Sequence, residues 1–143
     1  LLNETLPKIF SGDISPEKQD DAEATFARNI LREDEKIDWN ASARDVFNKV
    51  RALDPTPGAF TYLEGNVLKI WSTEEVKQGF ESNFDKVGTI IKQDKKNIYI
   101  LCGNKTVLKV NELQVSGKKR MPVVNFLSNK KDYVGTVLGE ENE

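Results

Sequence analysis

The chain has 143 residues, no histidine, one cysteine and a formal net charge of −2. Without histidine, the commonest general base and the commonest metal ligand are absent, which argues against a zinc site and against histidine-dependent catalysis. A single cysteine cannot form an internal disulfide, and no apolar run in the sequence reaches the length of a membrane span. We therefore expect a cytoplasmic protein with no metal and no membrane partner.

The charge is distributed unevenly along the chain. Residues 1–38 carry 10 acidic and 5 basic side chains, residues 39–139 carry 10 acidic and 16 basic ones, and residues 140–143 add three glutamates. A basic body behind an acidic leader is compatible with a partner that bears phosphate groups. We expect a leader and linker over 1–38, one folded domain over 39–139 and a polar tail over 140–143.

The leader begins with the pattern of a helix end. Apolar residues recur at helical spacing over 1–12, and Gly12 is typical of a helix stop, whereas Pro7 predicts that no long helix forms here. Residues 13–23 contain a proline and a cluster of acids, which predicts an extended linker. The charged run at 33–35 predicts a solvated turn.

Residues 40–54 predict an amphipathic helix. Asn40 or Ser42 can cap its first turn, and apolar residues then recur at three- and four-residue spacing until Pro55 ends the helix. A second proline and a glycine follow directly. They predict a stiff turn that delivers the chain onto a sheet in one direction.

Short strands separated by turn signals follow this helix. They are predicted at 59–63, 67–71, 87–93, 98–102 and 106–115. Residues 72–86 predict a long loop, Pro122 opens a helix predicted over 123–129, and 134–138 is a candidate for a last edge strand. The pattern predicts a mainly β fold, an OB-like small β-barrel or strongly curled sheet, with a flanking helix at each end and an extended linker in front.

Few residues suggest catalysis. Asp38 is the most tempting acid, because its aromatic neighbour Trp39 could raise the pKa of the carboxyl group. A capping role for Asp38 or Asn40 explains the same residues without chemistry. Cys102 lies in an apolar run and is interpreted as a small buried hydrophobe, and the sequence singles out no pair of carboxylates.

A basic triplet is the clearest candidate for binding. Lys118, Lys119 and Arg120 stand in a predicted loop between a strand and a helix, where adjacent cations can meet successive phosphates, although many such triplets are merely solvated. Lys105 adds a cation in another predicted turn. We interpret most aromatic residues as core, which favours contact with a nucleic-acid backbone over readout of bases. The aromatics concerned are Trp39, Phe47, Phe60, Trp71 and Phe126.

Three motifs follow one another along the chain: IDW at 37–39, RALDPTPGAF at 51–60 and ELQVSGKKRM at 112–121. In this order they resemble the carboxyl-terminal region of the methionyl-tRNA formyltransferase family. The leader over 1–38 resembles the end of that family's catalytic domain and its linker. Only 72–86 matches poorly, as expected of a variable loop.

The resemblance implies an enzyme that transfers a formyl group from 10-formyltetrahydrofolate to the methionyl group of initiator tRNA. The catalytic residues and the cofactor would belong to an amino-terminal domain in cis, so the fragment itself would be non-catalytic and bind no cofactor. Its nucleic-acid partner would be the initiator methionyl-tRNA. The resemblance implies contacts from Lys118, Lys119 and Arg120 and, more weakly, from Arg28 and Arg32 in the linker.

Two alternatives stay open. The chain could be the structural carboxyl-terminal domain of another folate-dependent formyltransferase or formyl hydrolase, which binds no RNA. It could also be a free-standing interaction module. The basic motif argues against the first alternative, and the apolar residues of the leader, which call for a neighbouring domain, argue against the second.

Overall fold

The structure is a computed structural model that describes residues 1–77, 83–129 and 131–140. The helical elements are α1 (Leu2–Ser11), η1 (Asp21–Glu23), α2 (Arg32–Glu35), α3 (Ala43–Leu53), α4 (Val123–Phe126) and η2 (Leu127–Asn129). The strands are β1 (Ala59–Leu63), β2 (Asn66–Val76), β3 (Ile90–Gln93), β4 (Ile98–Leu101), β5 (Val107–Val115) and β6 (Met121–Pro122).

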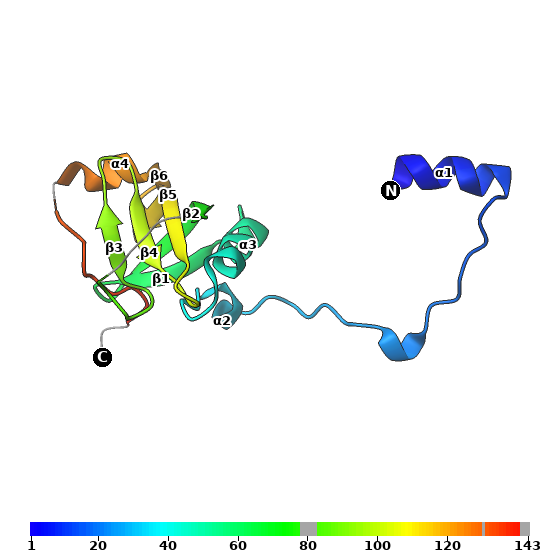
Figure 1. The fold of residues 1–143 in the computed structure, drawn as a ribbon, viewed down its shortest axis with the longest axis horizontal. Coiled ribbons are helices and arrows are strands. Elements are labelled where there is room, and N and C mark those ends of the chain that lie inside the picture. Colours follow the sequence, from blue (N-terminus) through cyan, green and yellow to red (C-terminus); the bar gives the residue numbers. More distant parts are fainter. Residues whose placement is uncertain (78–82, 130, 141–143) are drawn as a thin grey trace.

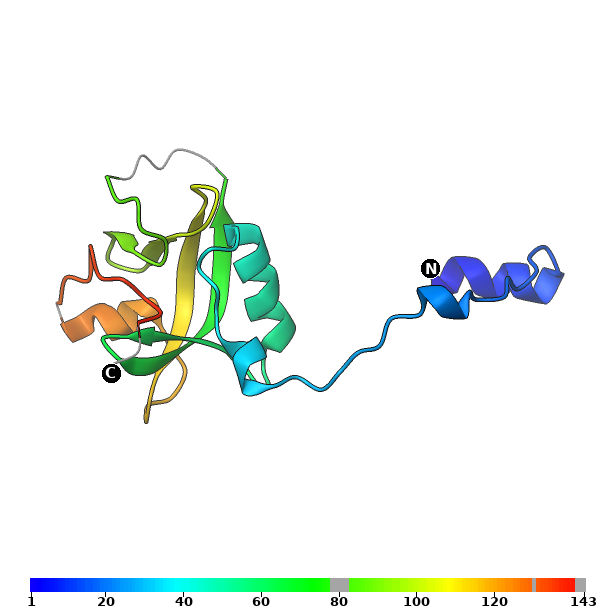
Figure 2. The same ribbon diagram turned by 90° about the horizontal axis from the view of Figure 1, so that it is seen from below.

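The leader is largely separate from the folded body. Helix α1 buries none of its residues, and extended chain joins it to the body across a wide gap (Figures 1 and 2). Gly12 ends α1 in the left-handed conformation with φ 76°, as predicted. Pro7 stands inside this ten-residue helix rather than ending it.

Helix α3 begins and ends where the sequence predicts. Of the two candidate caps, Ser42 is the one used: its Oγ accepts a hydrogen bond from the Asp45 amide at 3.2 Å and donates one to the Asp45 carboxylate at 2.6 Å. The helix ends at Leu53, just before the Asp54–Pro55 bond. Its buried face points into the core and consists of Ala43, Val46, Val50 and Leu53.

The strands form one antiparallel sheet in the order β1-β2-β5-β4-β3, with β6 paired to β5. The predicted mainly β architecture, with a helix at each end and a linker in front, is confirmed. The sheet is not closed into a barrel, so the OB-like description is not confirmed. Its two edge strands are instead bridged by the last segment: Ile90 of β3 donates to the carbonyl oxygen of Thr136, and Gly139 donates to that of Tyr62 in β1, each at 2.9 Å.

Several predicted boundaries were wrong. Strand β2 continues to Val76, because the polar residues after Trp71 still pair with β5, so the predicted 72–86 loop starts later; residues 78–82 of that loop lie outside the described residues. The expected turn at 33–35 belongs to the short helix α2. The expected strand at 134–138 makes only an isolated bridge between Thr89 and Val137. The end of the predicted tail, 141–143, is also outside the described residues.

The core lies between the curled sheet and α3. Leu68, Ile70 and Leu113 are fully buried at its centre, and Cys102 is buried as predicted. Of the aromatics interpreted as core, Trp39 and Phe60 are buried, whereas Phe47, Trp71 and Phe126 are half-buried. The half-buried rings therefore remain available to shape the surface.

Candidate nucleic-acid interface

The loop between β5 and β6 presents two lysines on a fixed turn. Gly117, with φ 73°, makes the turn, and the Lys118 amide donates to the Val115 carbonyl oxygen at 2.9 Å. The side-chain amide of Gln114 donates to the Lys118 carbonyl oxygen at 2.8 Å. Lys118 and Lys119 are exposed and form no ion pair with any residue in the described ranges. The loop projects from the body at the bottom of Figure 2.

The Arg120 side chain forms ion pairs with carboxylates of this chain. Its guanidinium pairs with Asp54 at 2.9 Å and with Glu112 at 2.5 Å, and it lies over the Trp71 ring at 5.2 Å from the centroid. Burial acts to lower the pKa of Arg120, but Glu112 and Asp54 outweigh it, so the pKa is raised above its usual value. Arg120 therefore ties the turn after α3 to β5, a positioning role in place of the expected open cation.

The Trp71 ring joins the parts of this site. Its indole N–H donates to Gln114 Oε1 at 3.1 Å, and Lys69 Nζ lies 5.5 Å from the ring centroid while donating to the Pro57 carbonyl oxygen at 2.7 Å. The ring also covers Gly58 so closely that a Cβ there would lie 2.5 Å from Trp71 Cη2. The RALDPTPGAF and ELQVSGKKRM motifs start 61 positions apart in the chain, at residues 51 and 112, and thus meet at one aromatic ring.

The two linker arginines are also paired locally. Arg28 forms a two-pronged contact with Asp34, at 2.6 and 2.7 Å, and the hydrogen bond to Asp34 raises the pKa of Arg28. Arg32 pairs with Glu35, and its guanidinium lies 3.8 Å above the centroid of the Phe60 ring. Neither arginine offers an unneutralised charge in this arrangement.

The pairing of the strands nevertheless brings the end of the linker and the β5–β6 loop to the same face of the sheet. Phe60, which lies under Arg32, is the cross-strand partner of Lys69, and Lys69 is the partner of Gln114. Directly opposed side chains share a face of the sheet. Cations therefore lie along this face and continue onto the adjoining β5–β6 loop, and we call this set the basic strip. It consists of Arg32, Lys36, Lys69, Lys118, Lys119 and Arg120.

The sequence interpretation missed two members of the basic strip. Lys36 lies 5.1 Å from the centroid of the Tyr62 ring, and Lys69 lies against Trp71. The alternation of residues in the strands held a signal for Lys69, because it shares an outward face with Trp71 two positions on. The position of Lys36 could not be predicted from the sequence, since it depends on the linker folding back onto the edge of β1.

Lys105 is not brought together with this strip. It stands in the turn before β5, whereas Lys118 follows the end of β5. Strand β5 has 9 residues, so its ends lie about 25 Å apart. Lys105 is exposed, at φ 55°, at the opposite end of the sheet.

The pKa of Asp38 and the pKa of Cys102 are each shifted away from the direction that catalysis by that group would need. The pKa of Asp38 is lowered, chiefly by the backbone N–H of Asn40 and then by its side chain, so the aromatic neighbour does not raise it. Burial raises the pKa of Cys102 to about 12, which leaves the thiol protonated. Within residues 1–77, 83–129 and 131–140, no group of three or more acidic, cysteine or histidine side chains is placed to hold a metal ion. In the same ranges, no helix is both long and apolar enough to cross a membrane.

The fold resembles solved structures of another protein. HypX from Aquifex aeolicus, in complex with tetrahydrofolic acid, matches with a TM-score of 0.55 over 90% of this chain and 22% of its own, at 18% sequence identity. A HypX variant matches 99% of this chain and 24% of its own with a TM-score of 0.58, also at 18% identity. At this identity the likeness concerns the fold alone.

Sequence comparison finds closer relatives. Methionyl-tRNA formyltransferases from Bacillus velezensis and Bacillus subtilis strain 168 are 43% and 41% identical to the chain over 143 residues. The alignments cover 100% of the chain and 44% of each relative, so the chain spans less than half the length of these curated relatives. The family described as formyl transferase, C-terminal domain, matches residues 29–131. Since this match takes in the whole sheet and α3, the chain belongs to the formyl transferase C-terminal domain family.

Proposed function

We propose that the chain is the tRNA-binding carboxyl-terminal part of a methionyl-tRNA formyltransferase, and that its basic strip meets the phosphates of the initiator methionyl-tRNA. Support comes from relatives of that name at 41–43% identity and from the surplus of basic residues over 39–139. The observation that carries the proposal is the pair Lys118 and Lys119, exposed on a braced loop and without an ion pair among the described residues.

In this proposal the chemistry belongs to the part of the protein that the chain does not span. Residues 1–38 would be the end of the catalytic domain and the linker, 39–139 the tRNA-binding domain and 140–143 a polar tail. The whole enzyme would take its formyl group from 10-formyltetrahydrofolate and act in the cytoplasm. The structural neighbour HypX binds tetrahydrofolic acid, which fits folate use by the family.

The contributions of the cations differ. Lys118 and Lys119 carry the main phosphate contacts, because binding them displaces no internal partner. Arg28 and Arg32 can take part only by exchanging Asp34 and Glu35 for a phosphate, so they contribute less. Arg120 contributes by holding the loop.

The test is a filter-binding titration of initiator tRNA at several salt concentrations. Replacing both Lys118 and Lys119 by alanine should weaken binding and flatten the slope of log affinity against log salt by about 1.5, because each phosphate contact contributes about 0.7–0.9. The matched control replaces Lys77 and Lys105, two exposed lysines at the far end of β2 and β5. It removes the same charge and should change the slope little. Equal effects of the two double variants on the salt slope would refute the assignment of the phosphate contacts to the β5–β6 loop.

One observation favours a second candidate function. Arg28, Arg32 and Arg120 all have acidic partners, as expected of a domain that only supports a catalytic partner and binds no RNA. In that case the wild-type chain would show no salt-dependent affinity for tRNA in the same titration.

A further inference from the structure

A pocket lies beside the base of the β5–β6 loop, outside the basic strip. Its volume is about 190 Å³, and it is bounded by the β1–β2 turn, the end of β5, α4 and the segment after it. Drug-sized ligands occupy pockets of about 300–1,000 Å³, so this one suits a smaller group such as a single planar ring system. The lining residues that matter for the argument are Glu64, Asn66, Ser116, Phe126 and Tyr133.

One wall of the pocket is a fixed aromatic surface. The rings of Phe126 and Tyr133 are stacked, with centroids 4.9 Å apart and planes 26° apart. Tyr133 is buried, its hydroxyl accepts a hydrogen bond from the Asn129 side chain at 2.9 Å, and Lys131 Nζ lies 5.0 Å from its ring centroid. Phe126 is half-buried and lines the pocket, with the buried Tyr133 ring behind it as a rigid support.

The lining also includes a carboxylate in an unfavourable backbone position, Glu64. Glu64 has φ 50° and precedes Gly65 with φ 76°, a turn in which asparagine or glycine is the favoured first residue. Lys131 Nζ contacts both carboxylate oxygens of Glu64, at 2.6 and 2.7 Å, and this hydrogen bonding raises the pKa of Lys131. Lys131 thereby offsets the charge of Glu64 beside a polyanion, and a carboxylate has about four acceptor sites, so Glu64 can accept a further hydrogen bond.

We propose that this pocket holds an unpaired nucleobase that bears an exocyclic amino group, with cytosine as the simplest case. The inference rests on the proposed function, because the base would belong to the RNA whose phosphates meet Lys118 and Lys119. Ser116 in the pocket wall is two residues from Lys118, so one strand can reach both places. Unpaired bases stack on aromatic side chains, and carboxylates accept hydrogen bonds from amino groups such as N4 of cytosine. Uracil presents a carbonyl oxygen at that position.

The test compares two single-stranded RNAs of equal charge, twelve cytidines and twelve uridines, binding to the full 143-residue chain. The cytidine oligomer should bind about five- to tenfold more tightly, the range expected for one added hydrogen-bonded and stacked base. Equal affinity of the two oligomers would overturn the proposal.

Variants separate the pocket from the phosphate contacts. Glu64→Asn suits the left-handed turn and replaces the carboxylate by an amide, which can donate to O4 of uracil as well as accept from N4 of cytosine, so it should abolish the preference for cytidine. Because it also leaves Lys131 without this carboxylate, it should strengthen the binding of both oligomers equally. Glu64→Gln keeps the side-chain length and carries the same amide group, so it should also remove the preference, which guards against a folding defect peculiar to one variant. The Lys118→Ala, Lys119→Ala double variant should weaken both oligomers equally and preserve their ratio. A preference that survives both Glu64 variants would contradict the role of the carboxylate.

A second measurement distinguishes failure of this inference from failure of the proposed function. Cytidine and uridine nucleosides carry no phosphate, so they probe the pocket alone in an NMR titration. Cytidine should shift the amide signals of Asn66 and Ser116 more than uridine does. Such shifts without salt-dependent tRNA binding would refute the proposed function but still support a base-binding pocket. Salt-dependent tRNA binding without these shifts would refute the pocket alone.

Discussion

Gly58 is the residue on which the geometry of the basic strip depends most directly. Its φ is +86°, and an added Cβ would lie 2.5 Å from Trp71, whose ring is fixed by Gln114. Gly58→Ala should therefore lower the free energy of unfolding by about 2–3 kcal/mol, from backbone strain and the displaced ring together. Urea unfolding followed by tryptophan fluorescence measures both the loss and the changed ring environment.

Gly117→Ala is the matched control for this change. Gly117 has φ +73°, and nothing lies within 4 Å of an added Cβ, so only the backbone term of about 1 kcal/mol applies. Its fluorescence should match that of the wild type. If Gly117→Ala destabilises the protein as much as Gly58→Ala does, the contact with Trp71 contributes nothing.

Cys102 should make stability depend on alkaline pH. Its thiol pKa is about 12 in the folded protein against 9.0 for an unperturbed cysteine, because burial disfavours the thiolate. A raised pKa means that this contribution is fully present below pH 9 and is lost as the pH rises from 9 towards 12. The free energy of unfolding should fall over that window more steeply in the wild type than in Cys102→Ala. Identical slopes in the two proteins would contradict the burial argument.

Single residues also show where prediction from sequence stops. The run from Lys118 to Arg120 reads as three equivalent cations, because a local pattern carries no information about distant partners. Arg120 is distinguished from its neighbours by Asp54, which lies 66 positions away and comes close only when the turn after α3 packs against β5. The basic loop itself was predictable, but the division between open and paired cations was not.

At the level of elements, α3 offers the cleanest test of a predicted feature. Ser42→Ala removes the acceptor of the Asp45 amide and the donor to the Asp45 carboxylate. The free energy of unfolding should fall by about 1 kcal/mol, as is usual for loss of a helix cap. Ser42→Asp retains an acceptor and should recover most of the stability. A neutral Ser42→Ala variant would mean that the cap adds nothing beyond the packing of α3.

Elements with strong local signals were predictable, and those that depend on pairing were not. Helix α3 carries its cap, its apolar stripe and its terminating proline within 16 residues, so its bounds follow from the sequence. The extension of β2 to Val76 and the short β6 exist because β5 offers hydrogen-bond partners on both sides. Polar residues such as Glu74 and Glu75 look like loop until that pairing is known.

At the level of the whole molecule, the order of strands was beyond the sequence argument for the same reason. Strand β2 pairs with β5, which places a segment near residue 70 against one near 113. Turn signals predict which strands are joined by hairpins but not which distant edges meet. The curled sheet was therefore predictable as a class, and its open edge between β1 and β3 was not.

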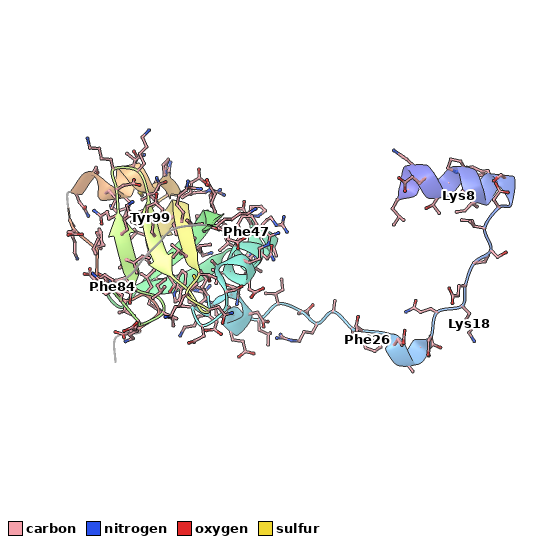
Figure 3. All side chains as sticks on the ribbon, viewed as in Figure 1. Lys8, Lys18, Phe26, Phe47, Phe84 and Tyr99 are labelled. Carbon is pink, nitrogen blue, oxygen red and sulfur yellow. The ribbon has the colours of Figure 1, made fainter. Side chains whose placement is uncertain are left out.

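The leader and the body should behave as separate units in the isolated chain. Helix α1 buries no residue, and the exposed chain between α1 and α2 contains Lys18 and Arg28. Figure 3 shows Lys8 and Lys18 on the leader, away from the side chains of the folded body. Brief trypsin digestion should cut after Lys8, Lys18 or Arg28 before it cuts the lysines of the sheet turns, because cleavage there requires local unfolding of hydrogen-bonded backbone. Mass spectrometry identifies the resistant fragment, which should begin at Gln19 or Asn29. Its thermal midpoint should equal that of the whole chain within about 1–2 °C, since no buried contact is lost. A clear drop in the midpoint, or early cleavage within the sheet, would show that the leader packs on the body and stabilises it.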